Sequence, residues 1–491
     1  MSNSTRRNFL RTSGLALTAA SICPAASAAK EASSKPNILM IAVDDLRPQL
    51  HAWEKEFMKT PNIDALCKRG VRFESAYCQI AVCGASRASL LTGLRPTRKR
   101  FLSYLTRADR DAKGIPMIPA TLKAAGYTCI ANGKISHHLD DNEPQWTQPP
   151  WRQKGSNWVT KENLDIMKEG RKNKVPQKKN RGMAYECADV PDSAYPDGRT
   201  LAQSITDLNR LAKADKPFFL ATGFVKPHLP FNAPKKYWDM YAKEGIVKLP
   251  DNYYKPKNTS KRYTSYTWHE MRAYAGIPPR GPVDRKTALK LIHGYYACVS
   301  YTDALVGELL GELTKLGLAE NTIVLLWGDH GWKLGEHAMW CKHTNFEIDC
   351  HAPLIISAPG TKFPKGTSCP SLVEFVDLYP TLCDLTGTKK PKHLQGDSLV
   401  PLLKNPATAD FKPAAFSRWP GLGESVKTKR YRYTEYRAKS DGPITDMILF
   451  DHKTDLAENQ NVATKPEYAK ALKEMQAILA AGYKAARPKK N

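Results

Sequence analysis

The stretch AVCGASRASLLTG, residues 81–93, places Cys83 four residues before Arg87, at the expected start of a helix. Backbone N–H groups and the helix dipole favour an anion at such a start. Cys83 therefore has three interpretations: a small buried thiol, a thiolate nucleophile of lowered pKa, or the precursor of a modified nucleophile. The other motifs of the chain have to decide among them.

Acidic residues end two buried apolar runs. Asp44 and Asp45 follow residues 37–43, and Asp329 and His330 follow the run TIVLLWG. Continuous apolar runs of this length are typical of strands covered on both faces. In an open α/β sheet, ligands bind at the carboxyl ends of the strands. Carboxylates gathered there repel one another unless a cation holds them, and an oxygen-rich site suits Ca²⁺ or Mg²⁺. A single Asp at a strand end more often caps a helix or turn, but two such ends favour a metal site.

Strands alternate with helices along most of the chain, which predicts an α/β sheet with helices on both faces. From about residue 392 the pattern changes to antiparallel strands and a terminal helix. We therefore expect a catalytic domain at 36–391 and a smaller C-terminal antiparallel-sheet subdomain at 392–491. The expected catalytic-domain elements are strands near 37–43, 128–131, 216–224, 321–329 and 351–360, a short helix followed by a strand within 60–77, and helices near 119–125 and 295–318.

Two segments interrupt this alternation and are predicted to be surface insertions. Residues 151–181 carry ten Lys or Arg and three acids, and residues 251–290 mix Tyr, Trp, Lys and Arg with several prolines. Either segment could be a solvated loop or could line a substrate groove.

The N-terminus resembles an export signal rather than part of the fold. Arg6 and Arg7 precede a short apolar run, and residues 26–28 (ASA) fit a cleavage site. This predicts a twin-arginine-type signal peptide at 1–28 and a bacterial product that is periplasmic or extracellular. The apolar run is too short to cross a membrane, and we expect no membrane span elsewhere. Cys23 lies in a poor lipoprotein motif.

The charge balance is strongly basic. The formal net charge is +26, and it falls to +23 without residues 1–28, which contain three arginines and no acid. This charge is explained either by solubility or by a polyanionic partner; no nucleic-acid-binding motif accompanies it. The ten cysteines outside that segment show no zinc-like spacing, and Cys341 and Cys350 are candidates for a disulfide.

The motif C-x-A-S-R followed by L-L-T-G resembles the signature of the type I formylglycine-dependent sulfatases, within the alkaline-phosphatase-like superfamily. The resemblance covers about residues 36–460. DDLRP, KPH-x-PF and DHGW-x-LGEH are similar to the iduronate-2-sulfatase-like branch. The resemblance to this family implies a large mixed sheet flanked by helices. Further motifs in the family's order are NGKISHH, CKHTNFE and VEFVDLYPTL.

The resemblance also implies a cofactor set. Cys83 would be oxidised to formylglycine by a maturation enzyme, and Arg87 would hold the hydrated diol. Calcium would be bound by Asp44, Asp45, the modified Cys83, Asp329 and His330. The diol would attack sulfur, displace the alcohol and then expel sulfate by reforming the aldehyde, whereas a plain serine would hold a stable sulfate ester.

The remaining site residues follow from the same resemblance. Lys134 would bridge the diol and the sulfate, and His137 would take a proton from the second hydroxyl, although the adjacent His138 leaves that assignment open. His228 and Lys342 would bind sulfate oxygens near the leaving group, and one could donate a proton to the departing alcohol. His337 and His343 match less clearly and are possible substrate contacts.

The expected function is a secreted calcium-dependent sulfatase acting on a sulfated oligo- or polysaccharide. One alternative is a phosphoryl or phosphonate ester hydrolase of the same superfamily. Another is a non-catalytic protein that binds sulfated glycans and keeps Cys83 unmodified. The sequence does not choose the sugar.

Overall fold

The structure is a computed structural model that describes residues 35–172, 181–260, 269–360, 363–419, 423–439 and 442–488. The predicted signal peptide and Cys23 lie outside these residues. The helices are α1 (Pro61–Arg69), α2 (Cys83–Thr92), α3 (Ala108–Asp111), α4 (Ile118–Ala124), α5 (Lys161–Lys172), α6 (Pro196–Leu211), α7 (Lys235–Asp239), α8 (His269–Arg272), α9 (Arg285–Lys315), α10 (Glu347–Cys350), α11 (Leu378–Leu385), α12 (Val400–Lys404) and α13 (Ala469–Ala485).

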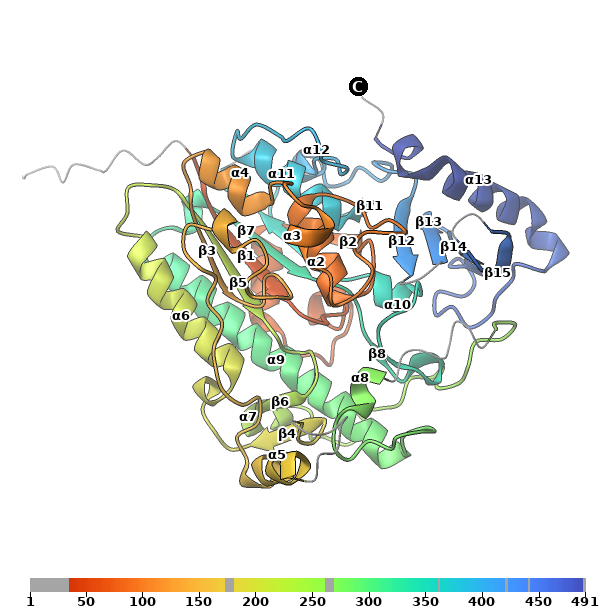
Figure 1. Cartoon of the computed structure of the whole chain (residues 1–491), viewed down its shortest axis with the longest axis horizontal. Coiled ribbons are helices and arrows are strands. Elements are labelled where there is room, and N and C mark those ends of the chain that lie inside the picture. Colours follow the sequence, from red (N-terminus) through yellow and green to blue (C-terminus); the bar gives the residue numbers. More distant parts are fainter. Residues whose placement is uncertain are drawn as a thin grey trace, which may run out of the picture. The chain divides into compact units, whose positions relative to one another are not determined.

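A seven-stranded mixed sheet forms the centre of the fold, with strand order β11-β2-β10-β7-β1-β5-β3 (Figure 1). Only β10 runs antiparallel to its neighbours; the other pairs in this sheet are parallel. The strands are β1 (Asn37–Val43), β2 (Val71–Tyr77), β3 (Thr128–Gly133), β5 (Phe218–Phe224), β7 (Thr322–Gly328), β10 (Leu354–Ser357) and β11 (Thr367–Glu374). This arrangement confirms the predicted α/β class.

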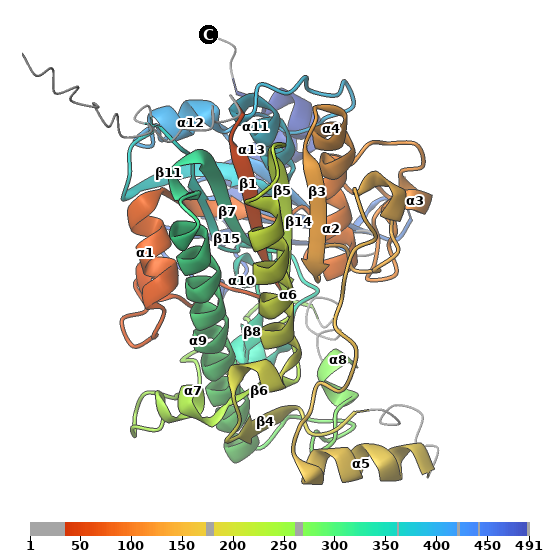
Figure 2. The ribbon, with the colours of Figure 1, turned by 90° about the vertical axis from the view of Figure 1, so that its left-hand side faces the viewer.

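Alternation along β1 shows why both sheet faces are covered. Leu39, Ile41 and Val43 belong to one core with α1, α6 and α9, whereas Ile38, Met40 and Ala42 belong to another with α2, α4 and α11. Successive side chains of a strand point to opposite faces, so an entirely apolar strand needs helices on both sides. Figure 2 shows α6 and α9 lying across one face.

Helix α9 begins at Arg285, ten residues before the predicted start. Asp284 caps it, accepting a hydrogen bond from the backbone N–H of Thr287 at 2.9 Å. The prediction that 151–181 and 251–290 are surface insertions is right only in part. Trp158 and Met271 are buried in the core with α9, because each insertion places an apolar side chain under its polar surface.

The C-terminal region forms a four-stranded antiparallel sheet with α13 packed on it, as expected. Its strands are β12 (Ala415–Trp419), β13 (Gly423–Lys427), β14 (Tyr431–Arg437) and β15 (Ile444–Asp451). Leu402 and Leu403 of α12 instead pack in the core beside α11. The domain boundary at residue 392 stays a prediction.

Two short sheets complete the described part. One pairs β4 (Tyr185–Ala188) with β6 (Phe231–Pro234), and the other pairs β8 (Lys333–Leu334) with β9 (Trp340–Cys341). Among the described residues, none of the helices combines the length and apolarity that a membrane crossing requires.

The candidate disulfide between Cys341 and Cys350 is not formed, since the structure gives both as free thiols. The Cys350 thiol contacts that of Cys78 instead. Tyr77, at the end of β2, pairs antiparallel with His351, and the N–H of Cys78 donates to the carbonyl of Cys350 at 2.9 Å. This pairing sets Cys78 opposite Cys350.

Candidate active site

The ends of β1 and β7 bring the predicted acidic residues together. The two strands are parallel neighbours with Val43 opposite Gly328, so the residues that follow them lie side by side. The backbone N–H of Asp45 donates to Oδ1 of Asp329 at 3.0 Å. Asp44, Asp45, Asp329 and His330 are all fully buried.

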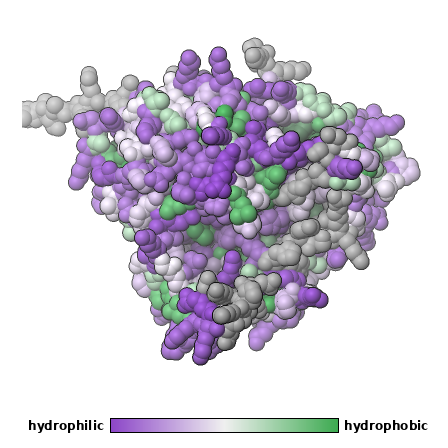
Figure 3. Space-filling view, in the orientation of Figure 1, coloured by the Kyte–Doolittle hydropathy of each residue, from purple (hydrophilic) through white to green (hydrophobic). Residues whose placement is uncertain are grey.

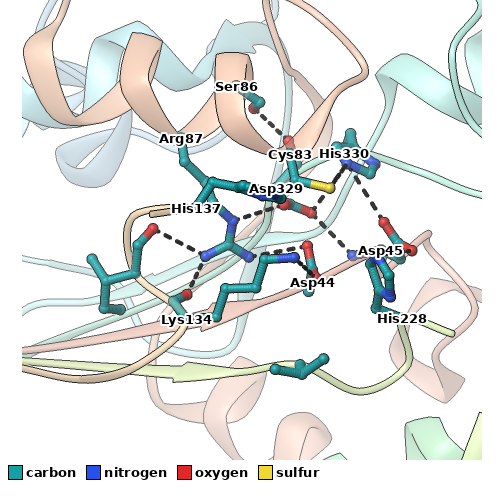
Figure 4. A network of polar contacts seen from close by, with 12 residues as sticks. Asp44, Asp45, Cys83, Ser86, Arg87, Lys134, His137, His228, Asp329 and His330 are labelled. Atoms are coloured by element: carbon teal, nitrogen blue, oxygen red, sulfur yellow. Dashed lines mark hydrogen bonds and ion pairs between the residues drawn. The ribbon is translucent and has the colours of Figure 1, made fainter. Parts of the chain in front are cut away.

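Cys83 lies at the first position of α2, directly against this cluster (Figure 4). Its Sγ is 3.4 Å from Nε2 of His330, and the residue is 3% exposed. Burial raises the pKa of the Cys83 thiol, with the Lys342 and Lys134 cations opposing the shift. All ten residues of α2 are buried, and a Cβ on Gly84 would lie 2.5 Å from the carbonyl oxygen of Tyr104.

Arg87 joins the carboxylates beneath Cys83. Its Nε donates to Oδ2 of Asp329 at 2.8 Å, and its Nη2 lies 3.3 Å from Oδ1 of Asp44. Its Nη1 donates to the backbone carbonyls of Lys134 and Ile135. One buried guanidinium thus connects α2, the ends of two strands and the loop after β3 (Figure 4).

The loop after β3 supplies the next cation. The ammonium of Lys134 contacts Oδ2 of Asp44. Although burial alone raises the pKa of Asp44, Lys134, His228 and Arg87 hold it well below its ordinary value. Arg152, from the basic insertion, donates to the carbonyls of Ser136 and His137 at 2.8 and 3.2 Å and so fixes this loop.

His137 is half-buried beside these cations. Burial, and then the charge of Lys134, lower its pKa to about 2, so its imidazole is neutral. Its Nδ1 has no hydrogen-bond partner within the part of the chain that the structure describes. The His138 ring packs against it edge-on at 5.0 Å.

His228 and Lys342 approach the cluster from the opposite side. Nζ of Lys342 is 2.9 and 3.1 Å from the two carboxylate oxygens of Asp45. Nε2 of His228 is 3.8 Å from Oδ2 of Asp45, and its Nδ1 lies 2.6 Å from the carbonyl oxygen of Leu229. Burial lowers the pKa of His228, but Asp45 and Glu270 outweigh it and raise the value to about 10.

Sequence reasoning missed Glu270, which α8 brings to this side of the site. Its Oε1 is 2.7 Å from Nε2 of His228, and its Oε2 is 2.8 Å from Nζ of Lys342. Burial raises the pKa of Glu270, but these two cations hold it well below the ordinary value. No periodic pattern or motif in the 251–290 segment marks this residue.

The two further histidines differ in position. His337 is 1% exposed, and its Nε2 lies 2.8 Å from the carbonyl oxygen of Ala457, so it is a structural residue. His343 is half-buried near Lys342 and Glu270; burial, and then Lys342, lower its pKa to about 3. Of the two predicted substrate contacts, only His343 lies in the site.

The donor atoms fit a hard cation. Asp44, Cys83, Asp329 and His330 each offer one atom within 4.8 Å of the others, and a second set replaces the last two by Asp45 and His228. Burial raises the pKa of Asp45 despite its Lys342 contact, and Asp44 adds to the rise. A bound cation would offset the unfavourable burial of these negative charges, and carboxylate oxygens suit Ca²⁺.

Comparisons with known proteins show which family the chain resembles. The sulfatase family profile matches residues 36–388, and that of the N-sulphoglucosamine sulphohydrolase C-terminal region matches residues 335–484. Iduronate 2-sulfatase of Mus musculus is 32% identical over 490 residues, covering 84% of this chain and 87% of that protein.

Two solved structures show the same fold. One, in complex with its substrate D-glucosamine-2-N,6-O-disulfate, has a TM-score of 0.73 at 22% identity, covering 92% of this chain and 98% of that one. The phosphonate monoester hydrolase of Agrobacterium radiobacter has a TM-score of 0.73 at 21% identity, covering 91% and 95%. The predicted alkaline-phosphatase-like sulfatase fold is confirmed.

Proposed function

The chain belongs to the sulfatase family, and from this premise we propose that it is a secreted, calcium-dependent sulfatase of a sulfated carbohydrate, using a formylglycine made from Cys83. Family membership makes it a sulfuric ester hydrolase. One observation carries the finer proposal: side chains from widely separated stretches converge on buried Cys83 with alternating positive and negative charge.

The metal ion and the modified residue would supply the reactive groups, and the side chains around them would hold both in place. Calcium and a formylglycine diol, when present, supply a charge-neutralising centre and a nucleophilic hydroxyl that can later collapse to an aldehyde. Asp44, Asp45, Asp329 and His330 would hold the ion with residue 83. Arg87, locked between two carboxylates, orients position 83 and cannot rotate away.

Fixed cations explain how an anionic ester can be bound and attacked. Lys134 and Lys342 reach the carboxylates from opposite sides of Cys83, so a sulfate group between them would meet two ammonium groups. Preorganised charges of this kind stabilise a transition state in which negative charge grows on the leaving oxygen.

The two histidines suit opposite proton-transfer roles. His137 is neutral, and its Nδ1 has no hydrogen-bond partner among the described residues, so it is available to accept a proton from a hydroxyl on residue 83. His228, with a pKa of about 10, carries a proton at Nε2 that it can give to the departing alcohol. Environments that push two pKa values apart support assigning one group as base and the other as acid.

A sulfated carbohydrate is supported by similarity and charge. The relative above is named for iduronate 2-sulfate, and the formal net charge here is +26. Figure 3 shows hydrophilic side chains gathered at the bottom of the view, where α5 lies. Exposed cations there can attract a polyanion over about 8 Å at physiological ionic strength. They are Lys161, Lys168, Arg171 and Lys172.

The test combines product analysis with mass analysis of the protein. Protein made with a maturation enzyme should release inorganic sulfate from a defined sulfated oligosaccharide. Its Cys83 peptide should be lighter by about 18 Da, the loss on converting the thiol to an aldehyde. An unmodified Cys83 peptide in active protein would reject the formylglycine proposal. An unmodified peptide in inactive protein that binds sulfated glycans would support the non-catalytic alternative.

Phosphonate hydrolysis remains the second candidate, because a phosphonate monoester hydrolase shares the fold at a TM-score of 0.73. Paired sulfate and phosphonate esters of the same alcohol separate the two functions. A higher kcat/KM for the phosphonate would overturn the sulfatase proposal. Export is proposed from the N-terminal twin-arginine pattern and is tested by locating the protein and its new N-terminus in a bacterial host.

A further inference from the structure

Glu270 is an acidic residue, outside the predicted metal ligands, that the fold brings to His228 and Lys342 on the leaving-group side of the site. Helix α8 packs on β9, next to Lys342, and Met271 is fully buried. Figure 1 shows α8 near β8, the partner strand of β9. This anchorage directs Glu270 toward His228 and Lys342. Its side chain is 19% exposed.

Glu270 is placed as an anionic ligand of the two cations. One carboxylate oxygen lies 2.7 Å from Nε2 of His228 and the other 2.8 Å from Nζ of Lys342. Within the described residues, it belongs to none of the three groups of side chains that could hold a metal ion. Its carboxylate therefore occupies the position that the proposed function assigns to oxygens of the substrate sulfate.

A sulfate group and the Glu270 carboxylate cannot share these cations without repulsion, because both are anions held within a few ångströms of each other. When a substrate sulfate binds His228 and Lys342, Glu270 loses its partners. A largely buried carboxylate without a donor is costly, so it needs a new hydrogen bond. Among the residues that the structure describes, its Oε2 has no hydrogen bond of good geometry, although Nζ of Lys342 is 2.8 Å away.

We propose that Glu270 is a specificity-determining residue that holds the anion position in the empty site and then accepts a hydrogen bond from a sugar hydroxyl beside the sulfated carbon. This inference rests on the proposed sulfatase function. When a sugar sulfate displaces Glu270 from the two cations, the neighbouring sugar hydroxyl donates a hydrogen bond to its carboxylate and so offsets the lost ion pairs. Free sulfate and aryl sulfates lack that donor and are disfavoured.

The test compares wild-type protein with Glu270→Gln in calcium-containing buffer. The variant removes the competing charge and weakens the acceptor. We expect kcat/KM on a defined sulfated disaccharide to fall at least about tenfold, the lower range for a hydrogen bond to a charged group. On 4-nitrophenyl sulfate, kcat/KM should rise, because the charge that competes with the sulfate group is removed. Inorganic sulfate should bind about tenfold tighter, equivalent to about 1.4 kcal/mol.

Glu336→Gln is the matched control, because Glu336 is also a buried carboxylate, paired with Arg47 at 2.7 Å outside the site. Any effect of that variant should be the same on both substrates. If Glu270→Gln lowers kcat/KM equally on both substrates and weakens sulfate binding, Glu270 only supports the two cations and the inference is wrong. It is also wrong if all three measurements stay unchanged.

Sulfate binding by calorimetry requires no turnover and therefore separates the two proposals. If the wild-type protein releases no sulfate from either ester, the proposed function fails. Tighter sulfate binding by Glu270→Gln would still support the competition between Glu270 and an anion, and weaker or equal binding would reject it.

Discussion

Replacing Arg87 by Met tests the charge balance beneath Cys83. The Arg87 side chain is completely buried and connects Asp44 with Asp329. Met keeps a long apolar side chain of related shape but removes the charge and every donor. The two carboxylates then differ, because Asp44 retains the ammonium of Lys134 whereas Asp329 has no other Lys or Arg partner among the described residues.

The expected loss follows from that difference. Removing one partner of a buried ion pair leaves an uncompensated charge and typically costs about 3–5 kcal/mol. Asp329 keeps the hydrogen bond from the N–H of Asp45 at 3.0 Å, which offsets part of the penalty. For calcium-free protein we therefore expect a loss of about 3 kcal/mol in the free energy of unfolding. Saturating calcium should reduce the loss, because a cation again faces Asp329.

The assay is urea unfolding of the wild type and Arg87→Met, with and without calcium. Arg107→Met is the control, since its partners Asp109 and Asp140 are 31% and 69% exposed and such pairs contribute about 0–1 kcal/mol. A loss for Arg87→Met no larger than for the control would refute the reasoning. So would a loss that calcium leaves unchanged.

Chelating calcium, or replacing Asp329 by Asn, should lower the thermal midpoint, because calcium at a hundred times its Kd adds about 2.7 kcal/mol. An unchanged midpoint in protein shown by elemental analysis to lack metal contradicts this. Cys83→Ala should abolish turnover, and so should Cys83→Ser when mass analysis shows the serine unmodified; multiple turnover by that protein would exclude the diol chemistry. Burial raises the pKa of Glu374, but Arg95 and Lys412 outweigh it and lower the value from 4.5 to about 2. The Glu374 carboxylate therefore stabilises the folded state fully above pH 4.5, and this stabilisation is lost as the pH falls through about 2. The loss in free energy of unfolding caused by Glu374→Gln, measured by urea unfolding, should shrink by about 3 kcal/mol over that window. A loss that stays constant with pH would contradict the lowered pKa of Glu374. On a sulfated oligosaccharide, kcat/KM should fall with salt more steeply than on an aryl sulfate, and equal slopes would make the basic face a solvated surface. The steeper slope should flatten on neutralising Lys161, Lys168, Arg171 and Lys172.

Strand geometry predicts the acidic part of the site. Asp44 and Asp329 each end an apolar run, and parallel neighbours carry such ends to the same edge of the sheet. Arg87 follows Cys83 by one helical turn, so both face the same side of α2. The roles of Arg87, Lys134 and the other cationic residues came instead from the resemblance to the family.

Glu270 could not be predicted in this way. Its place depends on how α8 packs against β9 across an irregular segment, and no period or motif encodes that contact. The neighbour of Cys350 was missed for a related reason. Cys78 lies 272 positions earlier in the chain, and only the bridge between Tyr77 and His351 brings the two thiols together. Long-range pairings of single residues leave no local pattern.

The burial of Cys83 has a consequence for the order of events in the cell. With 3% of the residue exposed and Gly84 closed against the Tyr104 carbonyl, an enzyme cannot grip this segment once the protein has folded. The proposed oxidation must therefore come first, on a nascent or unfolded chain. The proposed twin-arginine export would then carry the folded, oxidised protein across the membrane. A cell that lacks the oxidising enzyme would then produce a folded protein with an unmodified Cys83. A cellular check that responds only to folding would not distinguish this inactive protein from the active one.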